Sequence, residues 1–317
     1  MTLGASPFRT AEAADEVTIK LGTLAPEGSP WYKSLRAMGD QWLTATGGKV
    51  KLKLYPGGVS GNEGGIIRKM RINQLQAATI TTTGLIDIER SSLSLQIPLA
   101  INTYEELDYI MQRMIPVFNK RLEEKGFKVL TWGDAGWVYF FTRTPVSTPT
   151  QLKQLKLWSW EGDPASTEAL SKVGLKPVTI SANDVLPALQ TGMAQGFPQT
   201  ALAALSLQWF GLAKNMVNLR WAPMVGATVI SMKAWNSIPA NLQPQVLKIA
   251  QAEGDKLKKN IRKLDEDAIK EMKKFGLNVV NPTNMPEWQK FAEAFYPAMR
   301  GTVITAYTMD QVIALHI

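Results

Sequence analysis

Hydrophobic and polar residues follow one another along the first part of the chain in patterns that predict a strand, a helix and a second strand. Residues 17–22 alternate and stop at a turn rich in proline and glycine, which predicts a strand. Residues 31–46 carry apolar residues at helical spacing, so Trp31 and Trp42 on this helix are predicted to pack in the core. Residues 50–55 alternate strictly and predict the second strand. The chain therefore opens as a βαβ unit.

The alternation of strands and helices continues further along the chain. A helix is predicted over residues 103–125, because Thr103 can cap its start and Glu106 follows three residues later. Further elements are predicted at residues 66–73, 77–82, 128–132, 139–142, 155–160, 166–173 and 183–191. Such alternation favours the α/β class, with helices on both faces of the sheets.

One long helix is predicted near the end of the chain. Residues 241–275 form a nearly unbroken helical pattern, and about 35 residues at 1.5 Å each would span roughly 50 Å. That is longer than one lobe of this size, so we expect the helix to cross two lobes. The length of 317 residues is comfortable for two lobes and long for a single core.

Composition and charge narrow the class of protein. Hydrophobic residues at 45% and charged residues at 20% are typical of a globular protein, and no window approaches the 18 or so apolar residues of a membrane span. The net charge of +8 could indicate nucleic acid, but cationic residues between positions 248 and 274 alternate with acidic ones, as on a solvated helix. We therefore expect no nucleic acid partner, and attraction to an anionic membrane surface or transporter stays open.

The start of the chain offers a weak export signal. Ala11-Glu12-Ala13 has the small-x-small form of a signal-peptidase site, but the apolar stretch that should precede it is missing. Residues 1–14 are interpreted as a remnant of a signal peptide, with a chance match as the alternative. The absence of cysteine fits the periplasm and also many cytosolic proteins.

The groups that most catalytic sites need are missing. His316 is the only histidine, which excludes histidine triads and zinc sites, and no G-x-S-x-G or S-x-x-K motif occurs. Residues 56–65 are glycine-rich but match neither nucleotide-binding pattern, and Glu63 would stand where a phosphate should lie. The acidic run from Asp265 to Asp267 is interpreted as helix surface. We expect no enzyme, no cofactor and no metal site.

Four segments in order along the chain resemble a known family. They are residues 55–63 (Tyr-Pro-Gly-Gly-Val-Ser-Gly-Asn-Glu), 73–79 (Asn-Gln-Leu-Gln-Ala-Ala-Thr), 145–156 (Pro-Val-Ser-Thr-Pro-Thr-Gln-Leu-Lys-Gln-Leu-Lys) and 188–196 (Ala-Leu-Gln-Thr-Gly-Met-Ala-Gln-Gly). Together they resemble the solute-binding proteins of tripartite ATP-independent periplasmic (TRAP) transporters, the DctP family. The similarity extends from about residue 17 to beyond residue 288.

The resemblance implies a fold, a location and partners. The expected fold is α/β and periplasmic binding protein type II-like, with two lobes, a cleft between them and a long C-terminal helix spanning both. Lobe I is expected at residues 15–137 plus about 222–262, and lobe II at 138–221 plus about 263–317. The expected protein is a periplasmic monomer that closes on a small molecule and delivers it to TRAP permease membrane subunits.

The chain departs from the family where the ligand is normally held. The arginine that usually grips a carboxylate is replaced by Trp158, and the second arginine, in a G-x-R segment, by Val138 after Trp137. Gln199 stands for an asparagine, and Ala182 for an aromatic residue. A buried carboxylate without a cation costs several kcal/mol, so these departures predict a neutral, hydrophobic or aromatic solute.

The predicted ligand-binding residues are Trp158, Trp160, Gln199, Trp137, Val138, Ala182, Glu63, Trp132, Trp209, Trp221 and Thr82. Two of these have an equally good alternative: Trp132 as core, and Glu63 as a cap of the following helix. One alternative function is an organic-acid receptor in which Arg143 or Arg68 takes over the carboxylate. Another is a periplasmic sensor or docking module without a transport role.

Overall fold

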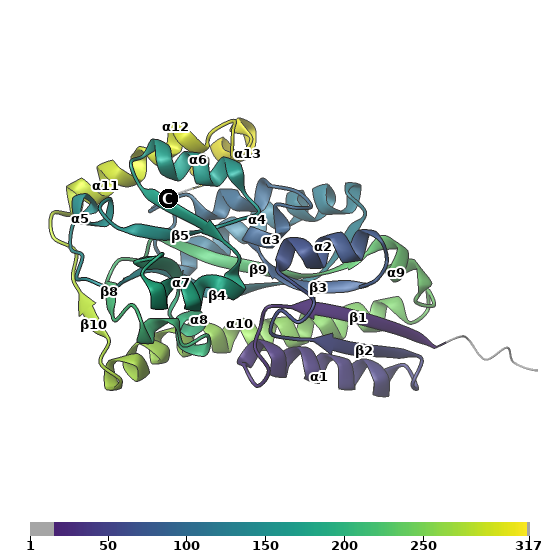
Figure 1. Cartoon of the computed structure of the whole chain (residues 1–317). Coiled ribbons are helices and arrows are strands. Elements are labelled where there is room, and N and C mark those ends of the chain that lie inside the picture. The colour runs from purple at the N-terminus through teal and green to yellow at the C-terminus, as the bar shows by residue number, and fades with distance from the viewer. Residues whose placement is uncertain (1–15, 316–317) are drawn as a thin grey trace, which may run out of the picture.

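Ten strands join into one mixed sheet in the computed structural model of the chain, which describes residues 16–315. Along the main path the strands run in the order β2-β1-β3-β9-β4-β7-β5-β6, and β8 and β10 pair beside it. Helices cover the sheet on both sides (Figure 1), which confirms the α/β class. The interpreted leader, residues 1–14, and His316 lie outside the described residues.

The first part of the sheet follows the predicted βαβ opening closely. Strands β1 (Val17–Thr23), β2 (Val50–Tyr55) and β3 (Ala77–Thr81) pair in parallel. The helices around them are α1 (Pro30–Ala45), α2 (Glu63–Arg71), α3 (Thr82–Leu85), α4 (Tyr104–Glu124) and α9 (Met232–Ser237), with the 3-10 helix η1 (Ser91–Gln96). Thr103 and Glu106 form the predicted capping box of α4, and Trp42 is fully buried, as predicted.

The second part of the sheet contains three short strands and two peripheral ones. Strands β5 (Lys156–Trp160), β6 (Lys176–Ile180) and β7 (Gly196–Thr200) pair in parallel, and β8 (Asn215–Val217) pairs with β10 (Asn278–Val280). The helices here are α5 (Pro149–Leu152), α6 (Pro164–Lys172), α7 (Val185–Thr191), α8 (Ala201–Ser206), α11 (Met285–Glu293), α12 (Phe295–Met299) and α13 (Ala306–Ala314). Across residues 16–315, no helix combines the length and apolar character that crossing a membrane would require.

Two long antiparallel strands connect the two parts. β9 (Ala222–Ser231) pairs along its whole length with residues 127–138 of β4 (Phe127–Thr142). The sequence predicted two separate strands at 128–132 and 139–142, and this is corrected: β4 is continuous, because residues 133–138 also pair with β9. The register irregularity between Asp134 and Gly136 accommodates the one extra residue there. β9 itself had not been predicted.

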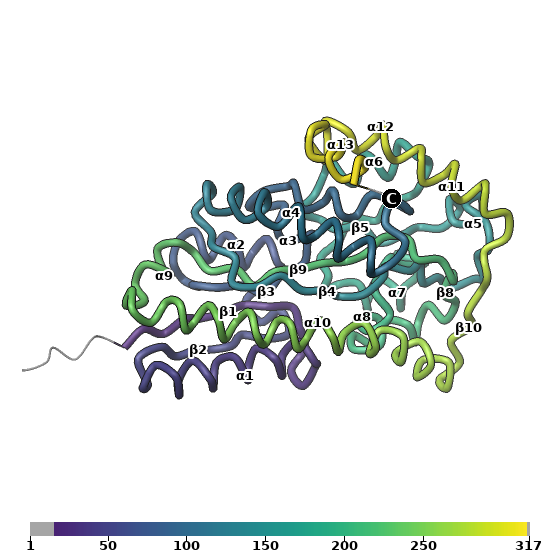
Figure 2. The backbone as a smooth tube through the Cα atoms, turned by 180° about the vertical axis from the view of Figure 1, so that it is seen from behind, coloured from purple at the N-terminus to yellow at the C-terminus, as the bar shows by residue number. Residues whose placement is uncertain are grey.

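Helix α10 (Gln243–Lys274) confirms the predicted long helix. Its 32 residues pack against α1 at one end and against β4 and α8 further on, and Figures 1 and 2 show it running beneath both parts of the sheet. The C-terminal helices lie on the opposite side, where α12 packs against α6 and α13 against η1. We call the part with β1, β2 and β3 lobe I and the part with β5, β6 and β7 lobe II; the residue boundaries from the sequence stay a prediction.

Although Glu266 is exposed as predicted, Asp265 is buried, which corrects its interpretation as helix surface. Its side chain is only 2% exposed, and its carboxylate accepts backbone N–H hydrogen bonds from Leu202 at 2.9 Å and Trp137 at 3.2 Å. Burial raises the pKa of Asp265 to about 6, although these hydrogen bonds act in the opposite direction. The carboxylate therefore ties α10 to the start of α8 and to β4, where the lobes meet.

Gly136 makes this contact possible, and its replacement tests it. Its φ of 110° suits glycine, and a Cβ here would fall 2.5 Å from Cγ of Asp265. We expect Gly136→Ala to lower the free energy of unfolding by about 3 kcal/mol in urea denaturation. Gly133→Ala, where a Cβ meets no atom within 4 Å, is the control and should stay within about 0.5 kcal/mol of wild type. Equal effects of both substitutions would contradict the assignment.

Candidate functional site

A cavity of about 400 Å³ opens between the lobes, beside the paired strands β4 and β9 that connect them. Lobe I contributes residues that follow β1 and β3, such as Ala25 and Thr83, and lobe II contributes residues of β5 and β7. The two long strands supply the floor with Val138 and Met224. Because both lobes line the cavity, a change in their separation would open or close it.

Six tryptophans contribute to the apolar wall. They are Trp31, Trp132, Trp158, Trp160, Trp209 and Trp221. Trp158 and Trp160 alternate on β5 and so face the same side of the sheet. The ring of Trp158 lies edge-on to that of Trp209, at 5.4 Å between centroids, and its Nε1 donates to the carbonyl oxygen of Ile180 at 3.0 Å. The wall is therefore held in place by its own contacts and is preformed for an apolar body.

Nine of the eleven predicted site residues lie on this lining. They are Trp158, Trp160, Gln199, Val138, Ala182, Glu63, Trp132, Trp209 and Trp221. The structure brings them together from seven separate segments of the chain. Their contact with a ligand stays a prediction.

Trp137 and Thr82 are corrections, because neither is among the residues that line the cavity. Trp137 precedes Val138 on β4 and so faces the other side of the strand, where it packs against Tyr104 at 5.3 Å between ring centroids. Thr82 starts α3 with its side chain fully buried, while its neighbours Thr81 and Thr83 reach the cavity.

The structure also decides the alternatives for single residues. The cap of α2 is Asn62, whose side chain accepts the backbone N–H of Gly65 at 2.8 Å, so the interpretation of Glu63 as the cap was wrong. Trp132 packs on Phe118 and also lines the cavity, so its core packing is confirmed and its contact with a ligand stays a prediction. Trp31 is half-buried and packs against the core, as predicted, and it also lines the cavity.

The charged residues on the lining are all acidic. They are Glu63, Asp134 and Asp163, and the lining contains no lysine, arginine or histidine. Asp134 pairs with Nε of Arg262 at 2.7 Å and Asp163 with Nη2 of Arg90 at 2.9 Å. The sequence reasoning missed both aspartates, because their partners come from distant segments.

Neither arginine proposed as a replacement cation reaches the cavity. Arg143 is exposed and its Nη1 donates to the carbonyl oxygen of Leu189 at 3.4 Å, beyond the lining. Arg68 lies on the exposed side of α2, near Asp87. The predicted relocation of the carboxylate grip to either arginine is therefore corrected.

Glu63 is the lining residue with the most unusual acid–base behaviour. The residue is 3% exposed, and its carboxylate accepts hydrogen bonds from the backbone N–H and from Oγ1 of Thr81, each at 2.9 Å. Burial raises the pKa of Glu63 from its ordinary value of 4.5 to about 7, and the bonds from Thr81 hold it below what burial alone would give. Near neutral pH this side chain can therefore either accept or donate a hydrogen bond.

Comparisons with known proteins agree on one family. The profile of the bacterial extracellular solute-binding proteins, family 7 (DctP), matches residues 21–303. The 2,3-diketo-L-gulonate-binding periplasmic protein YiaO of Escherichia coli is 21% identical over 281 residues, covering 87% of this chain and 84% of its own.

Solved structures show the same fold. A TRAP periplasmic solute-binding protein of Xanthobacter autotrophicus with bound β-D-galacturonate superposes with a TM-score of 0.87 at 18% identity, covering 94% of this chain and 99% of its own. Another from Desulfovibrio salexigens, with bound orotic acid, gives a TM-score of 0.86 at 17% identity, covering 95% and 97%. These likenesses confirm the predicted type II-like fold of two lobes.

The raised pKa of Glu63 predicts a pH dependence of stability. Because the folded chain holds this proton more tightly than the unfolded chain, the stabilisation is present below pH 4.5 and is lost as the pH rises through about 7. The free energy of unfolding of wild type relative to Glu63→Gln should therefore fall by about 3 kcal/mol between pH 4.5 and pH 8. Urea denaturation at both pH values measures it.

Glu105→Gln, at an exposed glutamate in the first turn of α4, is the matched control. Its free energy of unfolding relative to wild type should be the same at both pH values. A Glu63→Gln difference that is equally flat would contradict the assignment.

Proposed function

Because the chain belongs to the DctP family, family 7 of the bacterial extracellular solute-binding proteins, we propose that it captures one small organic molecule in the cavity between its lobes. It is a periplasmic solute-binding receptor of the TRAP type. The family consists of transport receptors rather than enzymes, and TRAP receptors deliver their solute to membrane permease subunits. Membership thus favours transport over the sensor or docking module, and the monomeric state stays a prediction.

The observation that carries this proposal is the shared lining of the cavity. Residues of lobe I, lobe II and both connecting strands face the same space of about 400 Å³, which is the size of a site for a small molecule. Closure of the lobes would surround the solute, and opening would release it. The apolar wall would supply most of the contact area, and Glu63 and Gln199 would hydrogen-bond to polar groups of the solute.

The relatives favour an organic acid as the solute over the neutral molecule predicted from the sequence. The proteins compared bind 2,3-diketo-L-gulonate, β-D-galacturonate and orotic acid, each of which carries a carboxylate. We therefore place an organic acid first. The aromatic wall adds that its body is apolar or aromatic, as a planar ring would pack on the indole faces.

A neutral apolar or aromatic solute is the second candidate, and one observation favours it. The charged lining residues are carboxylates, so an acid would enter without a cation to contact directly. Arg90 and Arg262 lie behind the wall, but each is already bonded to an aspartate there. A neutral solute would avoid this electrostatic cost.

Matched pairs of probes separate the two candidates. Orotate is uracil with an added carboxylate. Galacturonate carries a carboxylate where galactose has a hydroxymethyl group. We expect orotate to bind at least about tenfold more tightly than uracil, measured by calorimetry and by tryptophan fluorescence. Tighter binding of the uncharged member in both pairs would overturn the acid in favour of the neutral solute.

Trp158 should be needed for whichever probe binds. Trp158→Ala removes a central part of the wall, and we expect affinity for that probe to fall by about tenfold or more. Trp235→Ala is the matched control, because Trp235 is buried at the far end of lobe I and is not on the lining. Unchanged affinity in Trp158→Ala, with the protein folded by circular dichroism, would contradict this role.

A further inference from the structure

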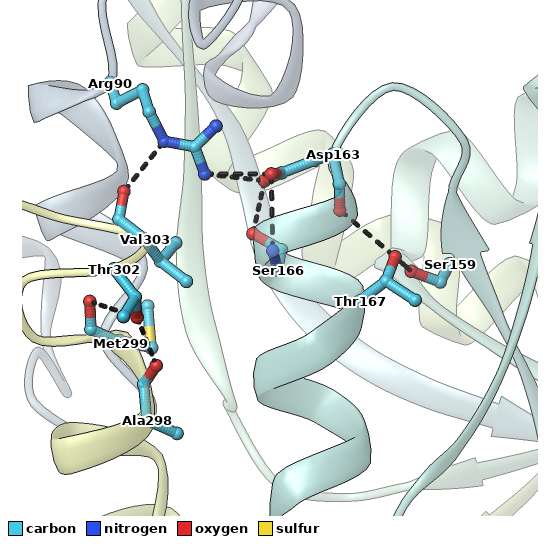
Figure 3. Close-up of polar contacts among 9 residues, drawn as sticks. All are labelled: Arg90, Ser159, Asp163, Ser166, Thr167, Ala298, Met299, Thr302 and Val303. Atoms are coloured by element: carbon cyan, nitrogen blue, oxygen red, sulfur yellow. Dashed lines mark hydrogen bonds and ion pairs between the residues drawn. The ribbon is translucent and has the colours of Figure 1, made fainter.

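Three separate parts of the chain meet at the side chain of Arg90 (Figure 3). Nη2 of Arg90 donates to both carboxylate oxygens of Asp163, at 2.9 and 3.1 Å, and Nε donates to the carbonyl oxygen of Val303 at 2.9 Å. Arg90 lies between α3 and η1 in lobe I, Asp163 at the start of α6 in lobe II, and Val303 between α12 and α13. One guanidinium therefore joins lobe I, lobe II and the C-terminal segment.

The acceptor side of this junction is held rigidly. Asp163 caps α6, accepting from the backbone N–H of Ser166 at 3.3 Å, and its side chain is 4% exposed. Thr167 of the same turn donates to the carbonyl oxygen of Asp163 at 3.1 Å and bonds with Ser159 of β5 at 3.2 Å. Asp163 is thus fixed to the strand that carries Trp158, one of the lining residues.

The junction lies where the cavity closes. Asp163 lines the cavity, and Arg90 contacts Asp163 from the opposite lobe. Nearby, Nδ2 of Asn62 at the start of α2 donates to Oε1 of Glu161, so the lobes touch at a second point. With the side chain of Arg90 34% exposed and that of Asp163 nearly buried, the pair is only partly screened by water.

We propose that Arg90 is a positioning residue for solute capture, which stabilises the closed arrangement of the lobes by bridging Asp163 and Val303. It acts through Asp163 and the C-terminal segment, without touching the solute. The inference rests on the proposed function in so far as closure serves capture. Opening the lobes separates the charge-assisted contact of Nη2 with both oxygens of Asp163 and leaves Asp163 with weaker donors. This loss biases the equilibrium toward closure.

Chemical trapping of the closed arrangement tests the proposal in the absence of any solute. The chain has no cysteine, so Asn62→Cys with Glu161→Cys provides a single labelled pair across the contact of the lobes. The rate of cross-linking by a short bis-methanethiosulfonate reagent then reports how often the lobes close, even when the closed state is rare. In this background we expect Arg90→Met to lower the rate roughly fivefold.

A double-mutant cycle separates the bridge from general loosening. Asp163→Asn keeps a good helix cap and removes the charge, so it should slow trapping to a similar degree. Combining it with Arg90→Met should add little, because both changes remove the same contact. Arg90→Lys should recover only part of the rate, since an ammonium cannot bond Asp163 and Val303 with the same fork.

Arg300→Met is the control, because Arg300 pairs with Asp310 within the C-terminal segment at 2.6 Å. It should leave the trapping rate unchanged. Equal trapping rates in wild type and Arg90→Met, or an equal loss in Arg300→Met, would overturn the proposal. Fully additive effects of Arg90→Met and Asp163→Asn would overturn it as well.

The trapping experiment and the solute titrations fail independently. Trapping is measured without solute, so the role of Arg90 in closure is tested even if orotate, galacturonate and their neutral partners do not bind. Conversely, if a probe binds but Arg90→Met leaves the trapping rate unchanged, the receptor function stands and only the role of Arg90 is refuted.

Discussion

The passage of the paired strands β4 and β9 from one lobe to the other is the constraint on which the rest of the molecule depends. Both lobes are built onto these two strands, so the strands must stay paired while they pass from one lobe to the other. The register irregularity at Gly136 turns β4 at this point, and the carboxylate of Asp265 fills the space that a larger residue would need. Long helix α10 is thereby fixed to the strands, and the cavity lies directly beside the junction.

The electrostatics of the cavity follow from where its cations are placed. Arg262 and Arg90 are not on the lining. Arg262 bonds Asp134 and Arg90 bonds Asp163, so their positive charges are compensated within the protein. The side facing the solute is then indole surface, hydroxyls and a glutamate that is protonated in part near neutral pH. Such a wall binds mainly through contact area, and its few hydrogen-bonding groups set the orientation of the solute. An acid that binds here would be held by hydrogen bonds and by the electrostatic attraction of Arg90 and Arg262, which lie behind the lining.

Much of the fold could be predicted because its signals are local. Strict alternation predicted the bounds of β2, a threonine followed by Glu106 predicted the start of α4, and an unbroken apolar period predicted α10. The candidate site was predicted mostly through resemblance, which places Trp158 and Gln199 at positions expected to meet the solute. What failed depends on contacts between distant residues. No local pattern distinguishes the buried Asp265 from its exposed neighbours, and none pairs Asp163 with an arginine 73 positions earlier.

Charge balance and movement are coupled in this arrangement. Asp163 cannot be buried on the cavity wall without a cation, and the cation that it uses belongs to the other lobe. Closure therefore does more than surround the solute: it supplies the partner of a carboxylate that would otherwise face the cavity uncompensated. When the lobes separate, water replaces Arg90 at Asp163, and the wall becomes more polar and more negative. The same ion pair thus makes the closed cavity both more apolar and more stable, which favours an apolar solute body only in the closed form.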